Sequence, residues 1–542
     1  MHRSPVRRRP TGDRESRGRQ GYAGRPAALG LAAVLAAVLA GAPALATPDD
    51  AGSTATTATD PARSTSAPDP AGATSSSDPA AATSTPEPTS PAQVRPVVAP
   101  AASPLGQVAD GRPPDPAAVE EVLEEELDST WLGPANRRAL TVRDALTGEH
   151  LLDRNADRLL TPASTTKILA AAAIVTGLDV QDTFPTRVVR GAEPQDLVLV
   201  AGGDMLLARG AGDPDSVAGH AGLGDLAGQV AQALDAEGLT GPVRLQVDLT
   251  HAAGPQVLES WTDFWVSEGY TGRIVQLGLQ EDRALPFYPS PDDPAQEAAR
   301  AFAGALVDHG VPVVGADGAE ITDRDDLADL PDVPEVEAPA GGGTPADGEE
   351  LAVVESAPLR DVLALALATS DNAMVEQLSR QAAVAAGRTA EQQDVASWVE
   401  DTLAQNYGVD LTGVEVADTS GLSDGTILPV RVVADLLVAG ADGSHPDLQE
   451  VLAAGGLPIA GYTGTLATRF HLPVHTPAIG TARAKTGSLP GVTSLAGTVV
   501  TADGRLLVYA LGADRIGEGG AVLEARSVLD EIVAELARCG CS

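Results

Sequence analysis

The sequence predicts an α/β protein in which an antiparallel sheet is flanked by helices. Residues 138–160 and residues 483–514, near the two ends of the ordered chain, alternate apolar and polar side chains as β-strands do. Residues 521–537 repeat apolar side chains with the period of a helix, and further runs of strong helix formers lie in between. These observations favour an α/β class over an all-helical or an all-β one.

The first 46 residues have the composition of a secretory signal peptide. Eight arginines stand within the first 25 residues, followed by an apolar run at 27–40 and the small-residue pattern Ala44-Leu45-Ala46. The apolar run is shorter than the roughly 20 residues that a membrane-spanning helix needs. We therefore expect residues 1–46 to be a signal peptide and the protein to be secreted, extracellular or associated with the cell wall. An uncleaved N-terminal membrane anchor is the alternative.

Residues 47–115 are rich in Ala, Pro, Ser and Thr and offer little surface to bury, so we expect a disordered linker there. The net charge of -39 and the pI near 4.4 exclude nucleic acid as a partner, because phosphate contacts need a basic face. The only two cysteines, Cys539 and Cys541, are too close together to close a long loop. A local pair, an intermolecular pair and no role at all stay open for them.

Order is expected to begin with a helix at residue 116. Asp115 suits a helix cap, Pro116 suits the first turn, and apolar residues then follow on one stripe. Residues 138–160 are expected to form a hairpin around Thr147 and Gly148. The run from Ser164 to Val175 consists mostly of strong helix formers, so Ser164 should open a buried helix.

The middle of the chain differs from the parts that flank it. It mixes strand-like, helical and acidic Pro/Gly-rich segments, and no repeat is evident. The expected elements are strands within 187–204, a helix at 224–238, an acidic loop at 324–350, a strand at 351–356 and a helix at 357–368. Further on, residues 483–514 are expected to form two antiparallel strands joined near Asp503 and Gly504.

The chain contains lysine at two positions only, Lys167 and Lys485, although it carries 36 Lys and Arg residues together. Arginine stays protonated in proteins, whereas the pKa of a lysine falls readily on burial or near another cation. A lysine kept in an arginine-using protein is therefore a candidate base. Ser164 stands three residues before Lys167, on the same face of a helix, which places a nucleophile beside its activator.

Three short motifs follow one another along the chain: Ser-x-x-Lys at 164–167, Ser-Asp-Asn at 370–372 and Lys-Thr-Gly at 485–487. Each of them alone is a weak signal, but the two lysines of the chain fall one in each lysine motif. In this order the motifs resemble the signature shared by penicillin-binding proteins and serine β-lactamases. The resemblance implies their fold, with an all-helical lobe that holds Ser164 beside the antiparallel sheet.

The spacing of the motifs indicates which group of penicillin-binding proteins the sequence resembles. Ser164 and Ser370 are 206 positions apart (370 − 164), far more than a minimal enzyme of this superfamily has. The gap is similar to that of class C low-molecular-mass penicillin-binding proteins, the D-alanyl-D-alanine carboxypeptidase/endopeptidase family, which carry inserted domains there. The expected organisation is a catalytic domain of two parts, 116–185 and 351–542, with one or two inserted, mostly β domains at 186–350.

The resemblance implies roles for eight residues. Ser164 would attack the substrate carbonyl and Lys167 would take its proton, while Lys485 would favour the neutral form of Lys167. Ser370 would relay a proton to the leaving amine, and Asn372 would position the substrate amide. Thr486, Gly487 and Ser488 would bind the substrate, the two hydroxyls holding its terminal carboxylate and the glycine allowing close approach. The backbone N–H groups of Ser164 and Ser488 would form the oxyanion hole.

The expected partners are peptidoglycan stem peptides, with β-lactam antibiotics as acylating inhibitors and without a cofactor or a metal. His471 and His475 have the spacing of metal ligands on a helix, but Pro473 between them breaks the helix that would align them.

A β-lactamase is one alternative function, although the Glu-x-x-Leu-Asn pattern of class A enzymes is absent between Asn372 and Lys485. A non-catalytic protein that binds β-lactams or peptidoglycan is the other. The balance between carboxypeptidase and endopeptidase activity stays open, as do the diamino acid of the stem peptide and the oligomeric state.

Overall fold

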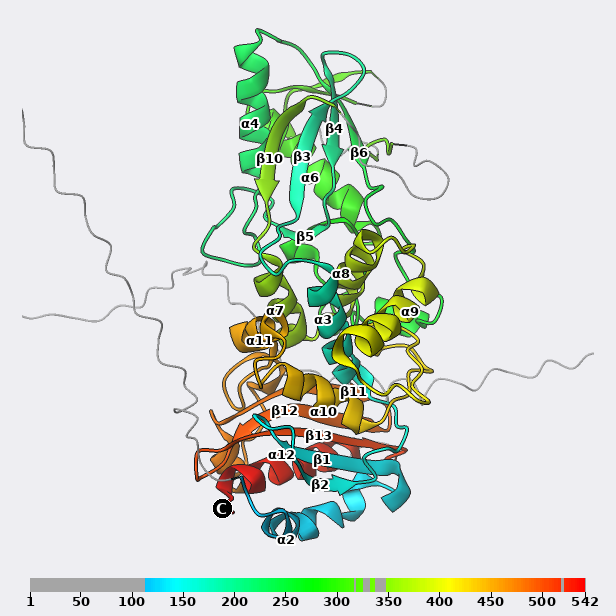
Figure 1. Ribbon diagram of the computed structural model, residues 1–542. Helices are drawn as coiled ribbons and strands as arrows, with labels where there is room; N and C mark the ends of the chain where they lie inside the picture. The colour runs from blue at the N-terminus through cyan, green and yellow to red at the C-terminus, as the bar shows by residue number, and fades with distance from the viewer. Residues whose placement is uncertain (1–112, 316–317, 325–331, 337–347, 518–520, 542) are drawn as a thin grey trace, which may run out of the picture. The chain divides into compact units, whose positions relative to one another are not determined.

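The computed structural model describes residues 113–315, 318–324, 332–336, 348–517 and 521–541 (Figure 1). These residues all belong to one compact unit. The expected signal peptide, and the expected linker up to residue 112, lie outside the described residues. Among the helices that the structure describes, none has both the length and the apolar character needed to cross a membrane.

Five strands form an antiparallel sheet in the order β11-β12-β13-β1-β2, which confirms the predicted fold class (Figure 1). The sheet joins the two ends of the chain, since Val142 of β1 lies opposite Tyr509 of β13 and Leu152 of β2. The bounds are β1 (Arg138–Asp144), β2 (His150–Arg154), β11 (Ala482–Leu489), β12 (Val492–Val500) and β13 (Leu506–Asp514).

The expectation of two strands over residues 483–514 was wrong, because the structure has three there. The additional turn falls at Pro490 and Gly491, between β11 and β12. Gly491 has φ +71°, a conformation that glycine adopts without a steric cost and that permits such a tight turn. The proline and glycine were the available signal for this hairpin.

Helices cover both faces of the five-stranded sheet. Tyr509 of β13 packs with Leu123 and Ile532, which belong to α2 (Pro116–Leu127) and α12 (Ala521–Arg538). The adjacent Val508 points to the opposite face and packs with residues of α10 (Val430–Ala439). The two ends of the described unit also meet, because the amide of Asp115 donates to the carbonyl of Cys541 at 2.7 Å. Cys539 and Cys541 form a disulfide with each other.

A lobe of helices lies on the α10 side of this sheet and shares its core. Its central helix is α3 (Thr166–Gly177), in which every residue from Thr166 to Ile174 is fully buried. A helix that is apolar on all sides needs neighbours all round, and α10 and several helices of the lobe supply them. Four further helices make up the described lobe. They are α7 (Leu359–Thr369), α8 (Asn372–Ala385), α9 (Gln392–Thr402) and α11 (Pro446–Val451).

The inserted region contains a second sheet in the order β10-β3-β4-β6, with β4 and β6 parallel. This region was expected to be mostly β, but two long helices, α4 and α6, cover the apolar face of the sheet. A half-apolar sheet has to bury that face, and the helices do so. The bounds are β3 (Pro185–Arg190), β4 (Asp196–Val200), β6 (Arg244–Asp248), β10 (Glu350–Glu355), α4 (Leu223–Ala236) and α6 (Pro294–Asp308).

Smaller elements complete the inserted region. β5 (Asp204–Leu207) and β7 (Leu277–Leu279) form a parallel pair, and β8 (Val313–Val314) and β9 (Glu320–Ile321) an antiparallel one. The short helix α5 (Asp263–Ser267) precedes β7. Because β10 pairs with β3, with Val353 opposite Arg187, the chain leaves this region after residue 355, a few residues beyond the expected boundary at 350.

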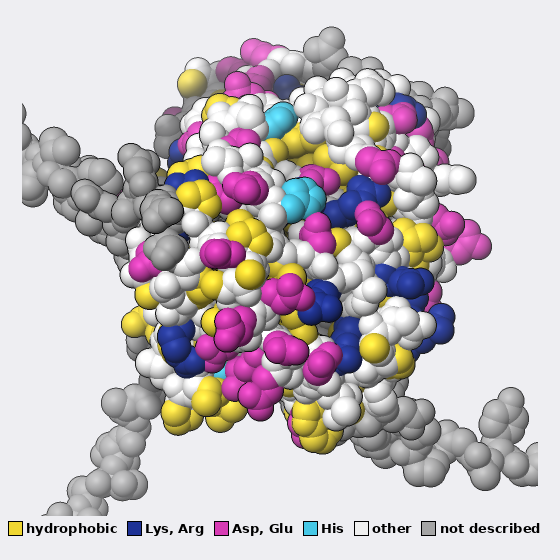
Figure 2. Space-filling model, turned by 60° about the horizontal axis from the view of Figure 1, so that its bottom comes forward, with side chains coloured by type: hydrophobic (Ala, Val, Ile, Leu, Met, Phe, Trp, Pro, Cys, Tyr) yellow, Lys and Arg dark blue, Asp and Glu magenta, His cyan; other side chains and the backbone are white. Residues whose placement is uncertain are grey.

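On the face drawn in Figure 2, acidic side chains are spread widely with arginines between them. Several arginines of the described surface form ion pairs with carboxylates, for example Arg154 with Glu120 at 2.5 Å. Exposed pairs of this kind contribute about 0–1 kcal/mol each, so they add little to the stability of the fold.

Candidate active site

Ser164 stands in a single turn of 3₁₀ helix, Ala163–Thr165, immediately before α3 (Thr166–Gly177). The sequence predicted that Ser164 would open the helix itself. The difference arises at Ala163, whose φ of +50° is strained for a residue with a side chain and makes the chain bend just before the serine. The turn leaves Ser164 half-buried and accessible, whereas Lys167, one turn further on, is fully buried.

The amine of Lys167 has three hydrogen-bond partners. Its Nζ lies 2.5 Å from Oδ1 of Asn372, 2.7 Å from the carbonyl oxygen of Ser420 and 3.2 Å from Oγ of Ser164. The amide of Asn372 is oriented by Nδ2, which donates to the carbonyl of Tyr270 at 2.9 Å. Two of the three partners are therefore oxygens that only accept. When the amine is neutral, they take its two N–H groups and its lone pair is directed at the hydroxyl of Ser164.

Burial lowers the pKa of Lys167 from its usual 10.5 to about 8. The carboxylates of Asp418, Glu376 and Asp371 act in the opposite direction and keep the pKa from falling further. An amine with a pKa near 8 is neutral in about a tenth of the molecules at pH 7, far more than an ordinary lysine. It has the basicity that a general base needs at that pH.

The second motif lies at the junction of α7 and α8. Ser370 ends α7 in the left-handed conformation, with φ +60° and ψ +36°, a second strained residue at the site. Asp371 caps α8 by accepting the amide of Met374 at 3.0 Å, and it forms an ion pair with Arg283 at 2.9 Å. Arg283 belongs to the inserted region, so a residue 88 positions earlier in the chain fixes this junction.

The third motif lies on β11, the edge strand of the five-stranded sheet. Nζ of Lys485 donates to Oγ of Ser370 and to the carbonyl of Thr486, both at 2.9 Å. Oγ1 of Thr486 lies 3.0 Å from Oγ1 of Thr465. A Cβ added to Gly487 would lie 2.7 Å from the carbonyl oxygen of Pro162 and 3.1 Å from the amide nitrogen of Ser164. The strand thus runs directly beside the turn that carries the serine.

Lys485 is as deeply buried as Lys167. Burial holds its pKa well below 10.5, and the charge of Lys167 lowers it further. A charge on either lysine thus disfavours a charge on the other, and a negative group that arrived at Lys485 would favour a proton there. A substrate carboxylate is a group of that kind.

The structure brings the predicted residues of all three motifs together. Hydrogen bonds join Lys167 to Ser164 and Asn372, and another joins Lys485 to Ser370. Gly487 packs beside Ser164. Ser488, the last of the predicted substrate residues, follows Gly487 on β11 and is half-buried. Sequence reasoning missed Ser420 and Thr465. Ser420 acts through its backbone carbonyl, which no side-chain pattern reveals, although the turn-rich segment 418–425 was noticeable.

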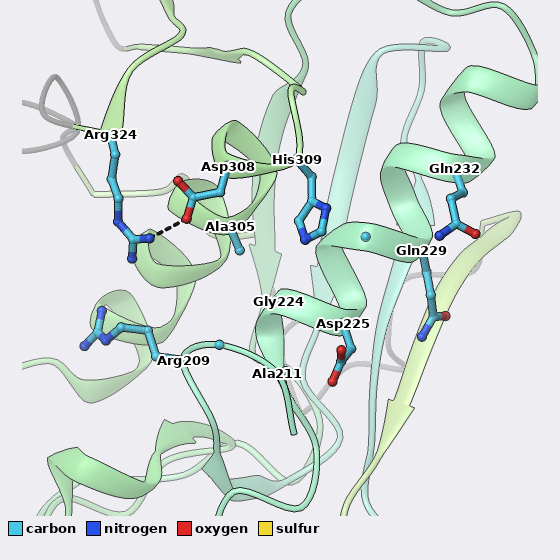
Figure 3. Close-up of a pocket in the computed structure, with 12 residues that line it drawn as sticks. Arg209, Ala211, Gly224, Asp225, Gln229, Gln232, Ala305, Asp308, His309 and Arg324 are labelled. Carbon is cyan, nitrogen blue, oxygen red and sulfur yellow. Dashed lines mark hydrogen bonds and ion pairs between the residues drawn. The ribbon is translucent and has the colours of Figure 1, made fainter. Parts of the chain in front are cut away.

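A separate cavity of about 720 Å³ lies in the inserted region, between α4, the end of α6 and the loop at 209–211 (Figure 3). His309 and Asp308 reach it from α6, and Asp225 from α4. Its arginines are paired, since Arg324 forms an ion pair with Asp308 and Arg209 one with Glu281. No residue of the three motifs lines it. Within the described part of the chain, no group of three His, Cys, Asp or Glu side chains is placed to hold a metal ion.

Comparison with known proteins gives a family match over more than half of the chain. The model of the D-Ala-D-Ala carboxypeptidase 3 (S13) family matches residues 123–285 and 340–536. A carboxypeptidase of Mycobacterium tuberculosis is 34% identical over 410 residues, which cover 74% of this chain and 80% of that protein. A D-alanyl-D-alanine carboxypeptidase of an Actinomadura species is 29% identical over 463 residues, covering 71% and 79%.

Among solved structures, penicillin-binding protein 4 of Haemophilus influenzae has a similar fold. It matches with a TM-score of 0.56 and covers 75% of this chain and 98% of its own. The sequences are 19% identical, so this likeness concerns the fold. It agrees with the antiparallel sheet, the helical lobe and the inserted region described above.

Proposed function

We propose that this chain, which belongs to the D-Ala-D-Ala carboxypeptidase 3 (S13) family, works through an acyl-enzyme on Ser164 and is acylated there by β-lactams. As a member of that family it is a serine-type D-Ala-D-Ala carboxypeptidase, a hydrolase. The observation that carries the proposal is the arrangement at Lys167. The oxygens of Asn372 and Ser420 accept two hydrogen bonds from its amine, so the lone pair of the neutral amine points to Oγ of Ser164, 3.2 Å away.

In the acylation step, Oγ of Ser164 attacks the carbonyl carbon of the penultimate D-alanine, and its proton passes to Nζ of Lys167. The tetrahedral intermediate then collapses, the C–N bond breaks and the terminal D-alanine leaves as its free amine. The leaving nitrogen takes up the proton that Lys167 received from Ser164, relayed through the hydroxyl of Ser370, which is hydrogen-bonded to Lys485 beside the site, so Lys167 becomes neutral again. Water later hydrolyses the ester on Ser164 and restores the enzyme.

We expect the terminal carboxylate of the substrate to be held on β11. Lys485, Thr486 and Ser488 lie along that strand, and the family resemblance implies that the hydroxyls of Thr486 and Ser488 hold the carboxylate. A carboxylate at this position would stabilise a proton on Lys485 and so favour the neutral form of Lys167. Substrate binding would thereby prepare the base for the reaction. The amides of Ser164 and Ser488 would stabilise the oxyanion.

The same apparatus accounts for β-lactams as inhibitors, since the strained lactam carbonyl would acylate Ser164. A β-lactamase must then hydrolyse the ester quickly, and class A enzymes use a Glu-x-x-Leu-Asn segment to do so. That pattern is absent between Asn372 and Lys485. We therefore expect the penicilloyl ester to persist. Peptidoglycan stem peptides are the proposed substrates, and a secreted or wall-associated protein with a signal peptide at 1–46 is the form that would meet them.

The test is to incubate residues 47–542 with a D-Ala-D-Ala pentapeptide and, separately, with a purified cross-linked muropeptide. We expect D-alanine to be released from the peptide, and benzylpenicillin to abolish the release and to leave a stable mass adduct on the Ser164 peptide. Cleavage of the cross-link would add an endopeptidase role. Rapid loss of the adduct with turnover of penicillin would instead indicate a β-lactamase. A stable adduct without release of D-alanine would indicate a non-catalytic binding protein, and equal release by Ser164→Ala would contradict the proposal.

A further inference from the structure

Ser420 connects the base to a buried carboxylate. Its carbonyl oxygen accepts Nζ of Lys167 at 2.7 Å, and its own amide donates to Oε1 of Glu376 at 2.7 Å. Ser420, in the loop 418–423, is thus hydrogen-bonded to the amine of Lys167 through its carbonyl and to the carboxylate of Glu376 through its amide. If Glu376 did not hold the amide, the carbonyl that orients Lys167 would lose its fixed position.

Glu376 lies on the same helix as the other acceptor of Lys167. It stands four residues after Asn372 on α8, which places both side chains on one face of the helix. Asn372 contacts the amine directly, and Glu376 acts on it through Ser420. Helix α8 therefore sets two of the three hydrogen-bond directions of Lys167.

A second buried carboxylate fixes the rest of the loop. Asp418 accepts the amides of Gly421 at 2.6 Å and Ser423 at 2.8 Å, and also Nε1 of Trp261 from the inserted region at 2.9 Å. The loop packs closely against the turn that carries Ser164, because a Cβ on Gly421 would collide with the carbonyl of Ala163. The loop, the base and the nucleophile are therefore one packed assembly.

Glu376 and Asp418 are 5% and 1% exposed. Burying two carboxylates near each other costs free energy that their hydrogen bonds only partly offset, and groups of this kind concentrate at active sites. Burial and the charge of Asp418 raise the pKa of Glu376 to about 7, although the hydrogen bonds from Thr419 and Ser420 oppose the rise. The other charged groups of the surroundings are Lys167 on α3, Arg380 on α8 itself and Asp371 at the start of α8.

We propose that Glu376 is a positioning residue for Lys167: through the loop 418–423 it holds the Ser420 carbonyl on the amine, and its charge sets how readily the amine gives up its proton. The proposal rests on the proposed function in taking Lys167 as the base, but it is measurable without turnover. The sign follows from charge. An ionised Glu376 favours the ammonium form, so removing that charge makes Lys167 easier to deprotonate.

The chain offers a direct probe, since it contains two lysines only. Residues 47–542 labelled with ¹³C at the lysine ε-carbon give two side-chain signals, which a Lys485→Arg variant assigns. We expect Lys167 to titrate near pH 8, and Glu376→Gln to lower that midpoint by about one pH unit. Gln377→Ala is the matched control. It alters the neighbouring buried polar side chain of α8, which has no charge, and should leave the midpoint unchanged.

Acylation by a fluorescent penicillin at pH 9 tests the positioning itself. The amide oxygen of Glu376→Gln still accepts the Ser420 amide, so its rate should stay within about threefold of wild type. Glu376→Ala leaves that buried amide without its acceptor and should be at least about tenfold slower than Glu376→Gln. Equal rates for the two variants, or a Lys167 midpoint in Glu376→Gln within about 0.2 pH unit of wild type, would overturn the proposal.

Two further experimental outcomes have a defined meaning for the proposal. If Glu376→Gln shows no cooperative unfolding transition, the variant is not folded and the titration of Lys167 in the wild-type protein becomes the test. A two-step titration curve, with a step near pH 7 from Glu376, supports the proposal. A single-site curve overturns it. If wild type releases no D-alanine while the Lys167 midpoint shifts as expected, the link between Glu376 and Lys167 stands and the proposed function fails.

Discussion

Replacing Lys167 with arginine is expected to lower the second-order rate constant of acylation by a fluorescent penicillin by about 10³-fold. A guanidinium can still donate to the carbonyl of Ser420 and to Asn372, but it stays protonated and offers no lone pair to the hydroxyl of Ser164. The substitution therefore removes the base and leaves a positive charge in place. Release of D-alanine should fall by the same factor, since both reactions need the same proton transfer.

The fold of the Lys167→Arg protein must be intact for this comparison, because the site is fully buried and arginine is the larger side chain. Thermal unfolding of the variant and of wild type gives that control, and Ser164→Ala gives the background of labelling without a nucleophile. An arginine variant that folds and is acylated within tenfold of the wild-type rate would show that Lys167 is not the base.

Gly487→Ala is expected to lower the acylation rate constant by about 10²-fold. The new Cβ would collide with Oγ of Ser494 and would lie 2.7 Å from the carbonyl oxygen of Pro162, closer than such atoms normally approach. Ser494 cannot move aside easily, because its hydroxyl donates to that same carbonyl at 2.6 Å. Relief of the collision must therefore move β11 away from the turn at Ser164, which opens the gap between the nucleophile and the strand that would bind the substrate.

Gly512→Ala is the matched control for this change. Gly512 lies on β13 of the same sheet, and a Cβ there would make ordinary contacts of 3.4 Å and 3.5 Å with Val430 and Leu160. We expect Gly512→Ala to be acylated at the wild-type rate. Gly487→Ala should also lower the free energy of unfolding by about 1–3 kcal/mol, as overpacking does. Equal acylation rates for the two alanine variants would contradict the close fit between β11 and the serine turn.

The sequence singled out side chains that the structure brings together, because the chemistry expected of them limits the choice. A lysine can serve as the base beside a serine where an arginine cannot, and the chain contains two lysines only, so Lys167 and Lys485 indicate the site from the amino-acid sequence alone. The hairpin of β1 and β2, strand β13 and α12 followed from periodicity, which depends on one buried face, whereas the turn that separates β11 from β12 did not.

The parts that the sequence did not predict depend on backbone atoms or on distant contacts. The carbonyl of Ser420 orients Lys167, yet any residue has such a carbonyl. The turn at Ala163 takes a strained conformation that only the packing around it enforces. Arg283 reaches Asp371 from the inserted region, a contact that separation along the chain conceals. Helix α6 went unnoticed, although Asp293 and Pro294 are a good helix start, because the region was expected to be mostly β.

The most direct test of the account is the pH dependence of acylation of the wild-type protein by a fluorescent penicillin. The second-order rate constant reports the ionisation of the free enzyme. Because Lys167 must be neutral to accept the proton, the rate should rise about tenfold per pH unit at low pH and level off above a midpoint near pH 8, the pKa that burial gives Lys167. A rate independent of pH between 6 and 9, or a midpoint below pH 6, would contradict a lysine as the base.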